Sequence, residues 1–173
     1  MKSMFVGLIV LATTLALPRT AVAQLSDEGL GERVAESIRT YAKFSIFDDI
    51  NVAVDNRKVT LLGRVTSPQK KAEIEKRVAK IDGIRTLQNE IGVLPVSQSD
   101  TRLRNIVASN IYRHPAFWQH AQLPNPPIHI IVENQHITLT GEVSSQVDSM
   151  LAYSLAQVHG ALSITNRIRV ARR

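Results

Sequence analysis

An internal repeat constrains this chain more than any other feature of its sequence. Residues 50–67 (INVAVDNRKVTLLGRVTS) align with residues 128–145 (IHIIVENQHITLTGEVSS) at a constant offset of 78 residues. Gly63 thereby pairs with Gly141, and the similarity continues after a one-residue deletion, where Gly83 pairs with Gly160. Self-similarity at a fixed offset indicates two copies of one folding unit.

Each copy carries the same succession of patterns. Apolar residues at helical spacing follow polar starts at 26–27 and 99–100, and predict a first helix. Alternating apolar residues on either side of tight turns at 55–58 and 133–136 then predict a β-hairpin. A second helix begins at the caps Ser67 and Ser145, and a last strand covers residues 87–93 and 164–170. The predicted apolar faces of the second helices are Ile74, Val78 and Ile81, then Val147, Leu151, Leu155 and Val158.

This succession predicts an α+β protein made of two tandem αββαβ modules, residues 26–95 and 99–171. A strand–helix–strand crossover places the last strand parallel to the second strand of the hairpin. We expect a three-stranded mixed sheet in each module, with both helices on one face and solvent on the other. A unit of about 70 residues is marginally stable alone, so the two modules are expected to support each other.

Residues 1–23 have the features of a cleavable signal peptide. Lys2 is followed by the apolar run 4–17, then by Pro18 and the small-x-small sequence 21–23. The run is shorter than the ~20 residues of a membrane span, although a retained N-terminal anchor is the alternative. The sequence has no cysteine, which excludes a lipid-modified cysteine after the signal as well as disulfides. We therefore expect a periplasmic protein.

The net charge is mildly basic. Without Lys2 and Arg19 the chain has 19 basic and 15 acidic residues. This balance is compatible with anionic lipid or acidic partners, and it lacks the concentrated basic face typical of nucleic-acid binders. We therefore expect no nucleic-acid partner.

The repeated segments 52–65 and 130–143 resemble the BON domain, a bacterial module named for osmotically inducible and nodulation proteins. The resemblance extends to Asn89 and Asn166 in the last strands and implies that Gly63 and Gly141 are the characteristic glycine of the family. A glycine within a strand permits close approach of another backbone, so we expect a structural role for both. The resemblance implies a non-catalytic envelope protein, periplasmic or membrane-associated, that binds phospholipid or protein surfaces and supports envelope integrity or osmotic stress tolerance.

The sequence lacks the usual motifs for catalysis and cofactor binding. It contains no nucleophile elbow and no glycine-rich phosphate loop, so we expect neither an enzyme nor a bound cofactor. All five histidines fall in the second module, but the predicted register separates His129 from His136 by ~13 Å, which is too far for one metal ion. We expect these histidines on the surface. Asp48 and Asp49 form a weak candidate for cation sensing.

The second module is the better candidate for function. The first module balances 12 basic against 11 acidic residues, whereas Arg102, Arg104 and Arg113 of the second module have no acid between them. The loop 114–127 is five residues longer than its counterpart and contains Phe117, a predicted core residue, and Trp118, the only tryptophan. An aromatic anchor beside cationic side chains suits an anionic membrane surface.

Two alternatives remain open. In the first alternative, Trp118 is buried and fills the interface between the two modules. In the other, the exposed sheet face and the Pro-rich loop bind polypeptide, as in a chaperone-like adaptor.

Overall fold

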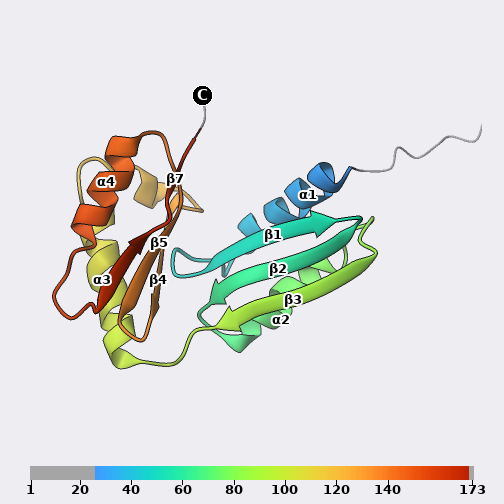
Figure 1. Ribbon diagram of the computed structural model, residues 1–173, viewed down its shortest axis with the longest axis horizontal. Coiled ribbons are helices and arrows are strands. Elements are labelled where there is room, and N and C mark those ends of the chain that lie inside the picture. Colours follow the sequence, from blue (N-terminus) through green and yellow to red (C-terminus); the bar gives the residue numbers. More distant parts are fainter. Residues whose placement is uncertain (1–25, 172–173) are drawn as a thin grey trace, which may run out of the picture.

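The computed structural model describes residues 26–171, which form two modules of similar architecture (Figure 1). The predicted signal peptide lies outside the described residues. The first module consists of α1 (Asp27–Arg39), β1 (Asp49–Asp55), β2 (Lys58–Val65), α2 (Pro68–Val78) and β3 (Thr86–Val93). The second consists of α3 (Gln98–Tyr112), the 3-10 turn η1 (His120–Gln122), β4 (Ile128–Glu133), β5 (His136–Val143), α4 (Gln146–Leu155), β6 (Ser163–Asn166) and β7 (Arg169–Val170).

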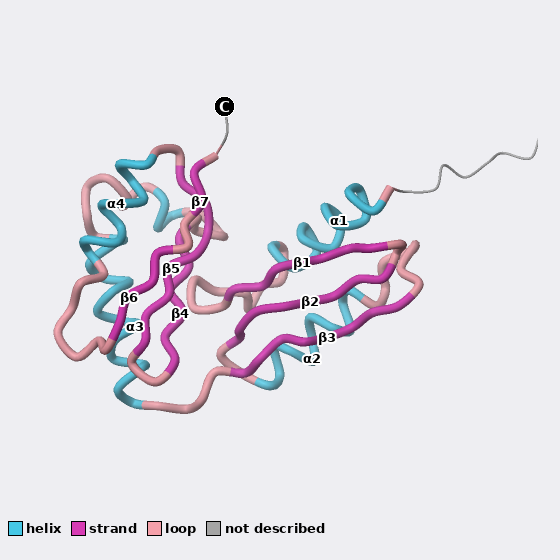
Figure 2. The backbone as a smooth tube through the Cα atoms, in the orientation of Figure 1, coloured by secondary structure: helices cyan, strands magenta, loops and turns pink. Residues whose placement is uncertain are grey.

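Both sheets have the predicted mixed topology. In the first, β1 pairs antiparallel with β2, and β3 pairs parallel with β2 on the other side. In the second, β4 is antiparallel to β5, while β6 and β7 are both parallel to β5. Figure 2 shows β6 and β7 as separate strands of the second module. The last strand of this sheet is thus divided into two short pieces, whereas β3 of the first module is continuous. The α+β class and the tandem αββαβ arrangement are confirmed.

Each hairpin turn is held by an aspartate of the preceding helix. Both central residues of the first turn have positive φ, 49° at Asn56 and 64° at Arg57, as a two-residue turn of type I′ requires. The carboxylate of Asp27 accepts from their two amides at 2.7 and 3.0 Å. Asp100 holds the second turn in the same way, at 2.9 and 2.8 Å. The repeat therefore extends to the contact between the helix and the hairpin.

Each of the four α-helices within the described residues begins at a serine cap. Ser26, Ser67 and Ser145 accept an amide hydrogen bond from the first turn, as predicted. The first helix of the second module begins two residues before the predicted start. Ser97 is its cap and accepts from the amide of Asp100 at 3.2 Å, so that Ser99 lies within the helix.

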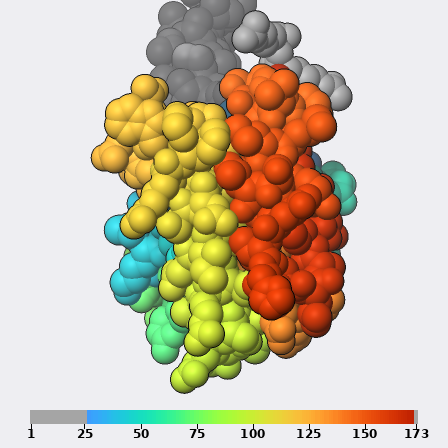
Figure 3. Space-filling view, turned by 90° about the vertical axis from the view of Figure 1, so that its left-hand side faces the viewer, coloured from blue at the N-terminus to red at the C-terminus, as the bar shows by residue number. Residues whose placement is uncertain are grey.

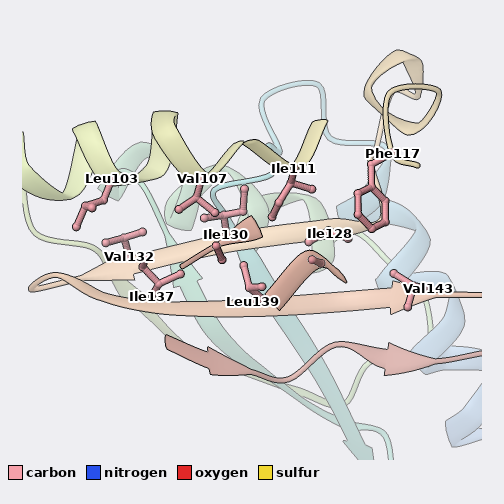
Figure 4. Close-up of a cluster of buried hydrophobic side chains, with 12 residues drawn as sticks. Leu103, Val107, Ile111, Phe117, Ile128, Ile130, Val132, Ile137, Leu139 and Val143 are labelled. Atoms are coloured by element: carbon pink, nitrogen blue, oxygen red, sulfur yellow. The ribbon is translucent and has the colours of Figure 1, made fainter. Parts of the chain in front are cut away.

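Each module has its own apolar core between its helices and its sheet. The second core contains residues of α3, β4 and β5 and the predicted Phe117 (Figure 4). The prediction for α4 was wrong at Val147, which is 73% exposed. The buried arc of α4 is centred on Ala152, and Val147 lies about 140° around the helix from it.

The two modules are in contact along β4. The segment 44–48 of the first module reaches this strand, where the amide of Ile130 donates to the carbonyl of Ile46 at 2.7 Å. Ile46 and Phe47 pack against the core of the second module. The face of β4 that was expected to be wet is consequently covered, and His129 is buried on it.

The expectation that all five histidines lie on the surface is therefore wrong for His129. Its Nδ1 lies 2.6 Å from the carbonyl oxygen of Asp48, and its ring lies against that of Phe44 with centroids 5.4 Å apart. Because a carbonyl can only accept, Nδ1 carries the proton in this contact.

Candidate functional site

The four residues predicted to bind lipid or a partner do not share one environment. Arg102 and Arg113 are exposed, on α3 and at its C-terminal cap, and Trp118 is 55% exposed. Arg104 instead is 8% exposed and donates from Nη2 to the carbonyl of Val132 at 2.6 Å. Burial lowers the pKa of its guanidinium, while the charge of Asp100 opposes this shift. Arg104 is therefore part of the structure of the module and is not available at its surface.

Trp118 does not plug the seam between the modules. That seam is filled by Phe44, Ile46, Phe47 and His129, whereas Trp118 points to solvent from the long loop of the second module. Its neighbour Phe117 takes the buried position. The loop thus holds one aromatic ring in the core and presents the other outside.

The outward side of α3 is a shallow groove of about 740 Å³. Arg102, Ile106 and Val96 line it together with uncharged polar residues, namely Ser97, Gln98, Thr101, Asn105, Ser109 and Asn110. The only acid of this helix, Asp100, is buried against the hairpin turn and does not reach the groove. Arg102 and Arg113 are separated by about three helical turns, or ~16 Å, and so lie on a similar side of α3.

The outward side of α4 adds an apolar stripe that the sequence analysis missed. Val147, Met150 and Tyr153 recur at intervals of three residues and are all exposed, the first two by 73% and 63%. Leu162, beyond the end of the helix, is exposed as well. The helices α3 and α4 lie side by side on one surface of the molecule (Figure 3), joined by a hydrogen bond from Asn110 to the carbonyl of Leu155. We call this surface the helical face of the second module.

The repeat supplies an internal comparison for this stripe. At the matching positions of α2 the first module has Gln69, Ala72 and Glu75. Six of the eleven residues of α2 are charged, against one of ten in α4. The sequence signal of the stripe is therefore this difference between the copies, with apolar or aromatic residues in α4 where α2 has small or polar ones.

Gly63 and Gly141 occupy positions where no side chain fits. Both have positive φ, 128° and 110°. A Cβ on Gly63 would lie 2.0 Å from the carbonyl oxygen of Asp49, and one on Gly141 would lie 1.9 Å from that of Pro127. The close approach of the neighbouring strand therefore explains the glycine in both modules.

The acidic pair is divided between two roles. Asp48 is fully buried, and its carboxylate accepts hydrogen bonds from Ser45, Thr66 and Lys70. With the ammonium group of Lys70 at 2.5 Å, this carboxylate is not available to a cation, and the cation-sensing alternative loses one of its two ligands. Among residues 26–171, no group of three His, Asp or Glu side chains is placed to hold a metal ion.

Two segments, residues 26–95 and 99–172, match the BON domain. The chain belongs to the BON family. BON domains are associated with binding to phospholipids and membranes. No helix within the described residues combines the length and the apolar character needed to cross a bilayer.

A curated relative of this BON protein is the 21 kDa hemolysin of Actinobacillus pleuropneumoniae. The two are 26% identical over 161 residues, which cover 88% of this chain and 79% of the relative. Two solved structures of CdsD, a structural protein of the type III secretion system of Chlamydia trachomatis, match at low similarity. The C-terminal domain aligns with 10% identity and a TM-score of 0.35 over 86% of this chain and 68% of that one. The second aligns with 9% identity and a TM-score of 0.31 over 81% and 91%.

Proposed function

We propose that this BON protein is an exported, non-catalytic protein that binds anionic phospholipid through the helical face of its second module. The observation that carries the proposal is the exposed apolar stripe Val147, Met150 and Tyr153 beside the arginine-bearing side of α3. Apolar side chains that penetrate the headgroup region and cations that remain among the headgroups are the usual division of labour at a membrane surface.

The charge distribution supports an anionic surface as the target. The groove on α3 offers Arg102 without a neighbouring carboxylate, and Arg113 and Trp118 lie near the other end of the same helix. In the first module, by contrast, exposed basic residues are interspersed with acids, as in the pairs Arg39–Glu36 and Lys43–Glu73. Lipid contact is therefore assigned to the second module, with the first as its support.

The wider role follows from the family and from the proposed export. A periplasmic protein with this face would bind a membrane surface that faces the periplasm. It would thereby contribute to envelope integrity or to tolerance of osmotic stress. The similarity to a protein named as a hemolysin is further support for action at a membrane.

Co-sedimentation with vesicles tests the proposal. We expect binding to vesicles containing phosphatidylglycerol, weaker binding at high salt, and little binding to phosphatidylcholine alone. Each basic residue near an anionic surface contributes about 1 kcal/mol, so Arg102→Glu with Arg113→Glu should weaken binding about 30-fold or more. Val147→Asp with Met150→Asp should weaken it at least about tenfold through lost apolar burial.

Matched variants of the first module serve as controls. Gln69→Asp with Ala72→Asp places two acids at the positions of α2 that correspond to Val147 and Met150, and should leave binding within about twofold. If these controls reduce binding as much as the variants of the second module, only net charge matters and the proposed face is wrong.

A further inference from the structure

The two hairpins differ in whether the main-chain groups on the outer edge of their first strand are hydrogen-bonded. In the second module, polar groups close the edge of β4. The hydroxyl of Tyr112 bonds both to the amide and to the carbonyl of Ile128, and Arg104 donates to the carbonyl of Val132. Between these contacts, the amide of Ile130 donates a hydrogen bond to the carbonyl of Ile46 in the first module. An edge of this kind cannot pair with another strand.

The corresponding edge of β1 is open. By the repeat, its outward main-chain groups belong to Ile50, Val52 and Val54. Within residues 26–171, no hydrogen bond engages the amides of these three residues. The positions of α1 that match Arg104 and Tyr112 hold Gly31, which has no side chain, and Arg39, which pairs with Glu36 at 2.7 Å. The first module thus lacks the two side chains that close the edge in the second.

A groove of about 730 Å³ runs between this edge and α1, which lies alongside β1 (Figure 1). Its lining combines small residues of α1 (Gly31, Ala35) and residues of β1 (Ile50, Val52) with the charged residues Glu32, Arg33 and Glu36 of α1. Arg39 and Arg169 stand at one end, where the groove continues into the cleft between the modules. Among the described residues, Arg169 has no ion-pair partner.

We propose that this groove binds an extended polypeptide, which adds to β1 as a further strand and places an acidic group at the Arg39–Arg169 end. A main chain is the ligand that presents donors and acceptors alternately at the spacing of a strand edge. The second module already shows such a contact, since a main-chain carbonyl of the segment 44–48 occupies the matching edge of β4. At the end of the groove, Arg169 has no ion-pair partner among the described residues, and Arg39 adds a second cation that shares its charge with Glu36. This pair of cations selects an acidic side chain or a terminal carboxylate.

Selection from a library of random peptides, followed by a titration of the selected peptides, tests the proposal. We expect enriched peptides to be acidic at one end and to protect the amides of Ile50 and Val52 from hydrogen exchange. Transplanting the closing side chains of the second module, as Gly31→Arg with Arg39→Tyr, should weaken binding at least tenfold. The fold should persist, because a Cβ on Gly31 meets only Val54 at an ordinary 3.5 Å.

A second variant tests the charged end independently. Arg169 lies on an exposed strand of the second module. Arg169→Glu should therefore weaken the binding of acidic peptides several-fold without unfolding the protein. Arg102→Glu with Arg113→Glu should leave peptide binding unchanged, so that failure of the lipid proposal and failure of this one are distinguished.

Three results would overturn the inference. In the first, the library yields no enriched peptide. In the second, the selected peptides bind the Gly31→Arg, Arg39→Tyr variant as tightly as the unaltered protein. In the third, the protein dimerises without peptide and the same double substitution abolishes the dimer, which would make a second copy of the chain the occupant of the edge.

Discussion

The glycine shared by the two modules offers a sharp test of the packing. Gly141→Ala adds one methyl group to β5 at a φ of 110°, directly against the carbonyl oxygen of Pro127 at 1.9 Å. That oxygen would have to move by more than 1 Å before the contact reached the 3.0 Å below which real Cβ contacts essentially do not occur. The strand pairing at Ile128, opposite Gly141, would be disturbed.

The cost has two parts. A residue with a Cβ at this φ is strained by about 1–3 kcal/mol. Forcing a methyl group into filled space costs about another 1–3 kcal/mol. We therefore expect Gly141→Ala to lower the free energy of unfolding by about 2–6 kcal/mol, and Gly63→Ala to do the same in the first module, where the contact is equally short.

Urea denaturation measures both changes. The emission of Trp118 reports on the second module, and far-ultraviolet circular dichroism reports on both. Gly31→Ala is the control, since its Cβ would make an ordinary contact in α1 and should stabilise the protein by about 0.5–1 kcal/mol. A loss below about 1 kcal/mol for Gly141→Ala, with the fold intact, would refute the account of this glycine.

Two further predictions concern polar groups in the first module. Asp48→Ala removes a buried carboxylate and leaves Lys70 and Thr66 without their partner, so it should cost about 3–5 kcal/mol in urea unfolding, and a loss under 1 kcal/mol would contradict this. Burial, and then the hydrogen bond to Glu73, raise the pKa of Tyr41 from 10.0 to about 12, so this tyrosine holds its proton more tightly in the folded state. Its contribution to stability is complete below pH 10 and is lost as the pH rises towards 12, and Tyr41→Phe should make the stability profile shallower in that window. A profile of unchanged slope would show that Tyr41 does not contribute.

Much of the fold is predictable because the sequence contains the same pattern of helices and strands twice. The tight turns predicted at 55–58 and 133–136 set the register of both hairpins correctly, with Asp55 opposite Lys58 and Glu133 opposite His136. The caps and the parallel last strand followed from local chemistry and from the handedness of crossovers. Comparison of the two loops by their distance from the first helix also placed Phe117 in the core.

The wrong predictions concern residues whose surroundings depend on contacts with distant parts of the chain or on small buried residues. His129 has the alternation of a surface position, but the segment 44–48 covers it, and no pattern within β4 reports that contact. The sequence predicts a surface cation at Arg104, because the strand edge that its side chain closes lies 28 residues further along the chain. Val147 fits the helical period of a core face, but the face actually buried is defined by Ala152 and Ser149, small residues that a hydrophobic pattern overlooks.

The emission of Trp118 during a titration with vesicles tests the central claim most directly, because it is the only tryptophan and stands exposed on the second module. We predict a blue shift with vesicles that contain phosphatidylglycerol, no shift with phosphatidylcholine, and loss of the shift in Arg102→Glu with Arg113→Glu. An emission spectrum that stays unchanged with both kinds of vesicle would contradict binding of anionic lipid through the second module.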